Sequence, residues 1–200
     1  MAALGFIVGL SGAMLPGPMS AYAISIALKS NITNVLLMVL GHIFIEAVTV
    51  ILLLLGLKQI IGSKIIFNML SIVGAGGVML MGLYIFLRTR QIKLSLHEKI
   101  NFSSGLILSG IFLTAFNPTF PAWWLSIGAG LLSRALMLGL AGVIVLVLGH
   151  WLSDLAWFSL LGFVVNRGKA WLNAKSYQSI LKTLGLILFG FGLWFIFQLN

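Results

Sequence analysis

The 200-residue chain is too apolar for a soluble protein of its size: 60% of its residues are hydrophobic, 8% are charged and the mean hydropathy is +1.16. This composition indicates an integral membrane protein. The net charge of +9 does not indicate a nucleic-acid partner, because the basic residues are spread between apolar stretches instead of gathering on one face. The absence of cysteine excludes disulfides and thiol redox chemistry.

Six uncharged or nearly uncharged stretches follow one another along the chain. They run from about Ala2 to Leu28, Val35 to Leu57, Ile65 to Leu87, Phe102 to Ser133, Ala135 to Val165 and Thr183 to Leu199. As a helix, each can cross a bilayer core of about 30 Å, which takes roughly 20 residues. Because the connections are too short for a soluble domain, we expect an all-α integral membrane protein with six transmembrane helices, whose activity resides inside the bundle.

The basic residues predict how these stretches are oriented. The connections after the first, third and fifth stretches hold Lys29, Arg88, Arg90, Lys93, Lys99, Arg167, Lys169, Lys175 and Lys182, whereas Lys58, Lys64 and Arg134 lie on the opposite side. Lysine and arginine accumulate in the cytoplasmic connections of membrane proteins. We therefore expect a multi-pass protein embedded in the lipid bilayer of a cell membrane, with both termini outside.

Proline interrupts the first and the fourth stretches. Pro16-Gly17-Pro18 and Asn117-Pro118-Thr119-Phe120-Pro121 hold all four prolines of the chain. Because proline removes a backbone donor and clashes with the preceding turn, we expect both helices to be broken there. A break exposes N–H groups that suit a substrate carboxylate, and Ser20, Asn117 and Thr119 add side-chain hydrogen bonds. The alternative is a kink that only shapes packing.

The second and fifth stretches each carry a histidine four residues before an acidic residue, as Gly41-His42-x3-Glu46 and Gly149-His150-x3-Asp154. A carboxylate inside a membrane costs roughly 2.5–3.5 kcal/mol on insertion scales, so its presence points to function. At this spacing the two side chains lie about 40° apart on one helical face and can share a proton. We interpret the pairs as proton-coupling groups. The alternative is that they tie helices together, which contributes about 0.6 kcal/mol on average.

The order of these landmarks in the first half of the chain recurs in the second. Each half has a proline-broken helix, then a helix with the Gly-His-x3-acid pattern, then a plain helix. Three spans per half is an odd number, so the two halves must cross the membrane in opposite senses. We therefore expect one membrane domain made of two inverted three-helix repeats, residues 1–100 and 101–200.

Tryptophans lie close to these landmarks. Trp123 and Trp124 follow the prolines of the fourth stretch, and Trp157 comes three residues after Asp154. Interfacial anchoring and a place in a cavity wall are equally good interpretations of them. With them, the candidate substrate-binding residues are Pro16, Gly17, Pro18, Ser20, Asn117, Pro118, Thr119, Trp123, Trp124 and Trp157.

Four motifs together resemble the LysE/RhtB (lysine exporter) family of amino-acid export permeases over essentially the whole chain. They are Leu15-Pro16-Gly17-Pro18, Gly41-His42-x3-Glu46, Asn117-Pro118 followed by Trp123-Trp124, and Gly149-His150-x3-Asp154-x2-Trp157. The resemblance implies proton-driven efflux of amino acids or related small metabolites across the inner, cytoplasmic membrane of a prokaryote. It is closest to the branch with a histidine before each acid, so no substrate is carried over from members with a different second-helix motif.

On this interpretation the helix breaks bind the substrate carboxylate, and Glu46 and Asp154 receive its amino group or protons. Alternating access would rock one repeat against the other. We expect no cofactor, and the sequence leaves a homo-oligomer open.

The same residues raise two alternative functions, divalent-metal export and intramembrane hydrolysis. The two histidines and two carboxylates His42, Glu46, His150 and Asp154 would also make a four-ligand site for divalent-metal export, if symmetry brings them together. The chain has no acidic or histidine-rich loop to gather ions, and its helix breaks suit an organic carboxylate better. An intramembrane hydrolase is disfavoured, because no nucleophile motif and no cysteine are present. We therefore expect a transporter and not an enzyme.

Overall fold

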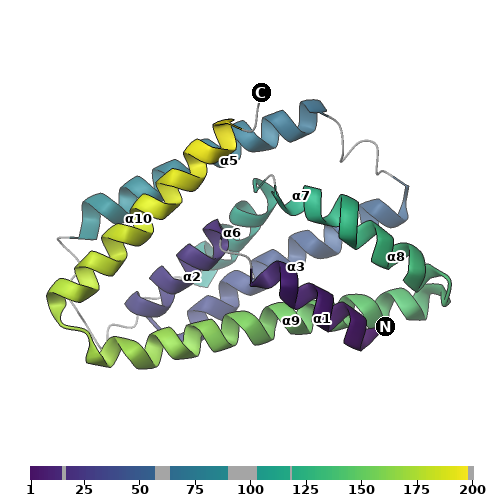
Figure 1. Cartoon of the computed structure of the whole chain (residues 1–200), viewed down its shortest axis with the longest axis horizontal. Helices are drawn as coiled ribbons and strands as arrows, with labels where there is room; N and C mark the ends of the chain where they lie inside the picture. The colour runs from purple at the N-terminus through teal and green to yellow at the C-terminus, as the bar shows by residue number, and fades with distance from the viewer. Residues whose placement is uncertain (15–16, 57–63, 90–102, 118, 198–200) are drawn as a thin grey trace.

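The computed structural model describes residues 1–14, 17–56, 64–89, 103–117 and 119–197, and every regular element within these ranges is a helix (Figure 1). By length and composition, the segments Ile32–Leu54 and Gly139–Trp171 can each cross a membrane, and two bent helix pairs raise the number of candidate spans to four. The described part of the chain is thus all-α and has the helices of a membrane protein. Four of the basic residues that predict the orientation lie outside the described ranges: Lys58, Arg90, Lys93 and Lys99.

The first bent pair consists of α1 (Ala2–Ala13) and α2 (Pro18–Lys29), whose axes differ by 82°. Gly17 is extended at the start of α2, and Pro18 occupies the first turn. Proline is well tolerated there, because the N–H that it lacks would have no helical partner. The break therefore falls where the prolines predict it.

The second bent pair consists of α6 (Ser103–Ala115) and a segment that begins at α7 (Thr119–Trp123), with an angle of 60° between them. A π-helical turn, Trp124–Gly128, follows α7 and leads into α8 (Ala129–Leu136). Single π-helical turns are rare and often accompany functional sites. This break also lies in the proline motif, whereas nothing in the sequence indicated the π-helical turn.

The two helices with the Gly-His-x3-acid pattern are α3 (Ile32–Leu54) and α9 (Gly139–Gly168). The side chain of Asn31 caps α3 by accepting a hydrogen bond from the N–H of Asn34. Gly139, with a φ of +73°, makes the turn from α8 into α9, and the left-handed region favours glycine. The predicted start of this helix at Ala135 is wrong, because Ala135 still belongs to α8.

The remaining long helices, α5 (Lys64–Arg88) and α10 (Ala174–Phe197), pack against each other in opposite directions (Figure 1). Gly82 faces the backbone of Gly185, so the two helices approach closely at this point. The helix α10 begins at Ala174, well before the predicted Thr183. Lys175 and Lys182 therefore lie on the helix, and their predicted place in a connection is wrong.

The first helix of each half packs on the second helix of the other half. Helix α1 lies along α9, and α6 lies along α3. A Cβ atom on Gly5 would collide with the backbone of Leu146, and one on Gly110 would collide with the backbone of Met38. Glycine at these positions lets the backbones approach closely, which is how helices associate in membranes.

Donors from the C-terminal half cover the end of α2. Asn166 Nδ2 lies 2.8 Å from the Ser30 carbonyl oxygen and 3.2 Å from that of Ala27. The buried ammonium group of Lys169, in the 3₁₀ turn Lys169–Trp171 after α9, donates to the same Ser30 carbonyl. A cation and an amide thus bind carbonyls that have no partner within their own helix.

Candidate functional site

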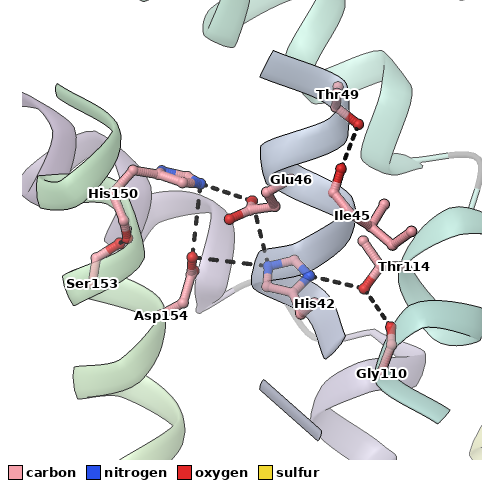
Figure 2. Close-up of polar contacts among 9 residues, drawn as sticks. All are labelled: His42, Ile45, Glu46, Thr49, Gly110, Thr114, His150, Ser153 and Asp154. Atoms are coloured by element: carbon pink, nitrogen blue, oxygen red, sulfur yellow. Dashed lines mark hydrogen bonds and ion pairs between the residues drawn. The ribbon is translucent and has the colours of Figure 1, made fainter. Parts of the chain in front are cut away.

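The two histidine–acid pairs of α3 and α9 meet in one cluster, and their four side chains point toward one another in Figure 2. His150 Nε2 lies 2.9 Å from Glu46 Oε1, and His42 Nε2 lies 3.4 Å from the same oxygen. Both Nε2 atoms lie 3.8 Å from Asp154 Oδ2. The shortest contact therefore joins the two helices, and not the two members of one pair. We call these four residues the His–acid cluster.

The antiparallel arrangement of α3 and α9 produces this crossing. His42 near one end of the contact faces Asp154, and Glu46 one turn later faces His150. The glycine before each histidine serves packing, since a Cβ atom on Gly41 would collide with the backbone of α6 and one on Gly149 with the backbone of α1. The Gly-His part of the motif thus holds a neighbouring helix close beside each histidine.

The two histidines have different neighbours on their other side. His42 Nδ1 lies 2.8 Å from the hydroxyl oxygen of Thr114 on α6, and its ring meets Phe120 edge-on. The ring of His150 stacks on Trp123 at 5.1 Å between centroids and meets Trp124 edge-on at 5.2 Å. Each helix therefore contributes one histidine and one acid to the cluster, but different groups position the two histidines.

The carboxyl groups keep free hydrogen-bonding capacity. Glu46 and Asp154 are each 2% exposed. Within the part of the chain that the structure describes, neither Glu46 Oε2 nor Asp154 Oδ2 has a hydrogen-bond partner. A buried carboxylate oxygen without a donor is costly, so each atom is well suited to a proton or a cation. One ligand atom from each of His42, Glu46 and Asp154 lies within 4.8 Å of the others, which is also a grouping that a metal ion can bridge.

A cavity of about 150 Å³ adjoins the His–acid cluster and reaches both helix breaks. Its wall includes Gly17 and Ser20 beside the first break, and Asn117 and Thr119 beside the second. Asn117 Oδ1 accepts hydrogen bonds from the Thr119 N–H at 3.1 Å and from the Thr119 hydroxyl at 2.8 Å, which caps the start of α7. A cavity of this size holds a molecule about as large as benzene, or about five waters.

Most of the candidate residues from the sequence line this cavity. They are Gly17, Ser20, Asn117, Thr119, Trp123, Trp124 and all four members of the His–acid cluster. Pro18 and Trp157 are not part of its wall, and Pro16 and Pro118 lie outside the described residues. Five further residues of the wall were not predicted: Gly12, Ala13, Met19, Phe120 and Phe158. Phe158 lies one turn after Asp154 on α9, so its place could have been predicted from helical spacing. Thr114, which contacts His42 from outside the cavity wall, has no such sequence signal.

In comparisons with known proteins, the model of the family described as LysE type translocator matches residues 10–199. The matched range contains both helix breaks and the whole His–acid cluster. No curated protein and no solved structure matches the chain.

Proposed function

The chain belongs to the LysE type translocator family, and on this premise we propose that it is a proton-coupled secondary transporter that exports amino acids or related small metabolites. Membership of this family makes it a transmembrane transporter. Proton coupling and the class of substrate are proposed from one observation: the buried His–acid cluster lies in the wall of a cavity that reaches both helix breaks. Such discontinuous helices near ionisable groups are the usual binding sites of secondary transporters.

The cluster supports coupling because a proton and an ammonium group neutralise a buried carboxylate in the same way. When protons occupy Glu46 and Asp154, the amino group of a substrate loses its binding partner, and when the substrate binds, the protons leave. Entry of protons down their gradient then drives the substrate out. Each elementary charge that crosses the membrane supplies about 2.3 kcal/mol per 100 mV.

The helix breaks supply the complementary half of the site. The first turns of α2 and α7 border the cavity through Gly17 and Thr119, and helix N-termini favour anions. No lysine or arginine is among the described residues of the wall, so the backbone N–H groups and polar side chains would bind the substrate carboxylate. The aromatic wall, with Trp123 and Phe120, suits the apolar part of a small amino acid or its cation.

We propose that the transporter has six spans arranged as two inverted repeats, residues 1–100 and 101–200. Paired contacts support this arrangement: Gly5 faces Leu146 as Gly110 faces Met38, and Gly82 faces Gly185 across α5 and α10. Alternating access would be a rocking of one repeat against the other.

The orientation with both termini outside a prokaryotic cytoplasmic membrane rests on the positive-inside rule. It is supported by the contact of Lys169 with Ser30, which brings the connections after the first and fifth spans to one end.

Transport in proteoliposomes tests the function. A panel of labelled amino acids is offered to inside-out vesicles with an imposed proton gradient, and uptake by the wild type is compared with that of Glu46→Gln and Asp154→Asn. Thr49→Val is a matched control. Thr49 is buried on α3 and lies outside the cavity wall, and among the described residues its hydroxyl bonds only to Ile45 of the same helix. We expect gradient-driven uptake in the wild type and the control, and markedly slower uptake in both acid variants.

Unchanged proton-driven uptake in both acid variants would show that protons couple outside the His–acid cluster. Uptake that is equally fast with and without the proton gradient would remove the proposal of proton coupling.

Export of a divalent metal ion is the second candidate, and the grouping of His42, Glu46 and Asp154 favours it. In a tetrahedral site with metal–ligand distances of about 2.1 Å, ligand atoms lie about 3.4 Å apart. The His42–Glu46 and His42–Asp154 distances of 3.4 and 3.8 Å are close to that value. The same vesicles offered Zn²⁺ or Mn²⁺ decide between the cargoes, and metal binding that is lost in His42→Ala and His150→Ala would favour the ion.

A further inference from the structure

We propose that Thr114 is a positioning residue that fixes the tautomer of His42, so that the ring presents a bare Nε2 to the His–acid cluster. The inference rests on the proposed function, because the cluster is taken as the coupling site. Thr114 lies on α6, is 2% exposed and does not line the cavity. It contacts Nδ1 of His42, on the side of the ring away from the carboxylates (Figure 2).

The two contacts of the Thr114 hydroxyl determine where its single proton lies. Its oxygen lies 2.7 Å from the Gly110 carbonyl oxygen and 2.8 Å from His42 Nδ1. A carbonyl only accepts, so two oxygens this close must share the single hydroxyl proton of Thr114. The hydroxyl then offers His42 only lone pairs. His42 Nδ1 must therefore be the donor, and in the neutral ring the second nitrogen, Nε2, has no proton.

The bare nitrogen faces the two acids. Nε2 of His42 lies 3.4 Å from Glu46 Oε1 and 3.8 Å from Asp154 Oδ2. A protonated Glu46 carboxyl can pass its proton to this nitrogen: the O–H bond breaks, an N–H bond forms, and a carboxylate and an imidazolium result. With the opposite tautomer Nε2 would already carry a proton, and the ring could not accept one on the side of the cavity. Thr114 thus keeps His42 ready to accept a proton.

Among the described residues, no hydroxyl is seen to hydrogen-bond to Nδ1 of the other histidine, His150. Gly9 of α1 lies beside His150 Nδ1, and a Cβ atom placed on it would come within 2.6 Å of that nitrogen. Gly9 therefore occupies the place at His150 that Thr114 has at His42, but it has no hydroxyl. The nearby hydroxyl of Ser153 donates to the backbone carbonyl of His150. Glu46, Asp154 and His150 are the titratable groups that face His42, while its neighbours Thr114 and Phe120 on α6 and α7 are uncharged. Of the two cluster histidines, only His42 has its tautomer set by a threonine.

Nitrogen NMR of protein with ¹⁵N-labelled histidine tests the tautomer directly. The chain has three histidines, so the spectrum of His42→Gln identifies the signals of His42. We expect neutral His42 to carry its proton on Nδ1 in the wild type and in Thr114→Ser, which keeps the hydroxyl. In Thr114→Val, which has the same shape without the hydroxyl, we expect signals of the Nε2–H form. A wild-type His42 that is protonated on Nε2 would overturn the proposal, whether or not the valine variant folds.

Transport then separates positioning from mere packing. At metal sites, removal of a group that orients a ligating imidazole typically costs 10- to 100-fold in affinity or activity, and we take this range as the expectation for Thr114. We expect Thr114→Val to slow gradient-driven uptake by about this factor and Thr114→Ser to remain within about twofold of the wild type. Equal rates in the two variants would refute the role of Thr114. If Glu46→Gln leaves uptake unchanged while the tautomer is as expected, the His–acid cluster fails as the coupling site and the tautomer assignment stands.

Discussion

Glu46 is the acid that both histidines approach most closely. Its Oε1 lies 2.9 Å from His150 and 3.4 Å from His42, whereas Asp154 is 3.8 Å from both. If the cluster transfers protons, Glu46→Gln therefore removes the better-placed group. We expect Glu46→Gln to slow gradient-driven uptake by about 100-fold or more, in the range of general acid–base groups, and Asp154→Asn to be roughly tenfold less severe.

Initial rates at saturating substrate in proteoliposomes measure this ranking, with Thr49→Val as the reference for a harmless change on α3. A larger loss in Asp154→Asn than in Glu46→Gln would contradict it.

The residues of the cluster could be predicted, but their partners could not. Helical spacing alone places His42 beside Glu46 and His150 beside Asp154. The shortest contact, from His150 to Glu46, depends on how α3 and α9 lie against each other, and no local pattern encodes that. Thr114 is the clearest miss, since a threonine in an apolar helix has no feature that links it to a histidine on another helix.

At the scale of the helix, the close contact of α3 and α6 depends on Gly110. A Cβ atom there would collide with the backbone of Met38, so Gly110→Ala must push the helices apart and weaken the Thr114–His42 contact. We expect it to lower the free energy of unfolding by about 1–3 kcal/mol, as overpacking does. Gly105 on the same helix has open space around it, and Gly105→Ala should be neutral or stabilise by up to about 1 kcal/mol.

Melting temperatures in detergent compare the two alanine variants. Equal destabilisation by both would show that alanine in α6, and not close contact with α3, is responsible.

The end of α2 depends on Lys169. Lys169 is 8% exposed, and its ammonium group bonds to the Ser30 carbonyl. Lys169→Met keeps the length of the side chain but leaves that carbonyl with only Asn166, so we expect a loss of about 1–3 kcal/mol of stability. Lys175 lies exposed on α10, and Lys175→Met should change stability by less than about 0.5 kcal/mol. Melting curves again provide the measurement, and a harmless Lys169→Met would show that the contact contributes little.

Helix breaks were predictable because proline acts locally, through its own ring and its missing N–H. Helix ends were less so. Hydropathy placed the start of the last helix at Thr183, because Lys175 and Lys182 look like connection residues, yet a helix that reaches the membrane surface can continue with polar residues. The π-helical turn after Trp123 depends on packing around the cavity and has no sequence signal.

For the molecule as a whole, composition identified the membrane class, and the repeated order of landmarks predicted the inverted repeat, which stays a proposal. Sequence patterns did not tell which helices of the two halves pack together. That choice depends on where glycines such as Gly5 and Gly110 leave room for a backbone from a distant part of the chain.

The packing of α1 on α9 and of α6 on α3 has a consequence for how the protein is assembled. The first helix of each half packs on the second helix of the other half. In this respect the chain resembles a domain-swapped dimer whose two subunits have been joined end to end. Neither half alone would complete the binding face of its own second helix. We expect residues 1–100 and 101–200, expressed as separate chains, to be degraded individually but to restore uptake when produced together. Uptake by either half alone would contradict this exchange of helices.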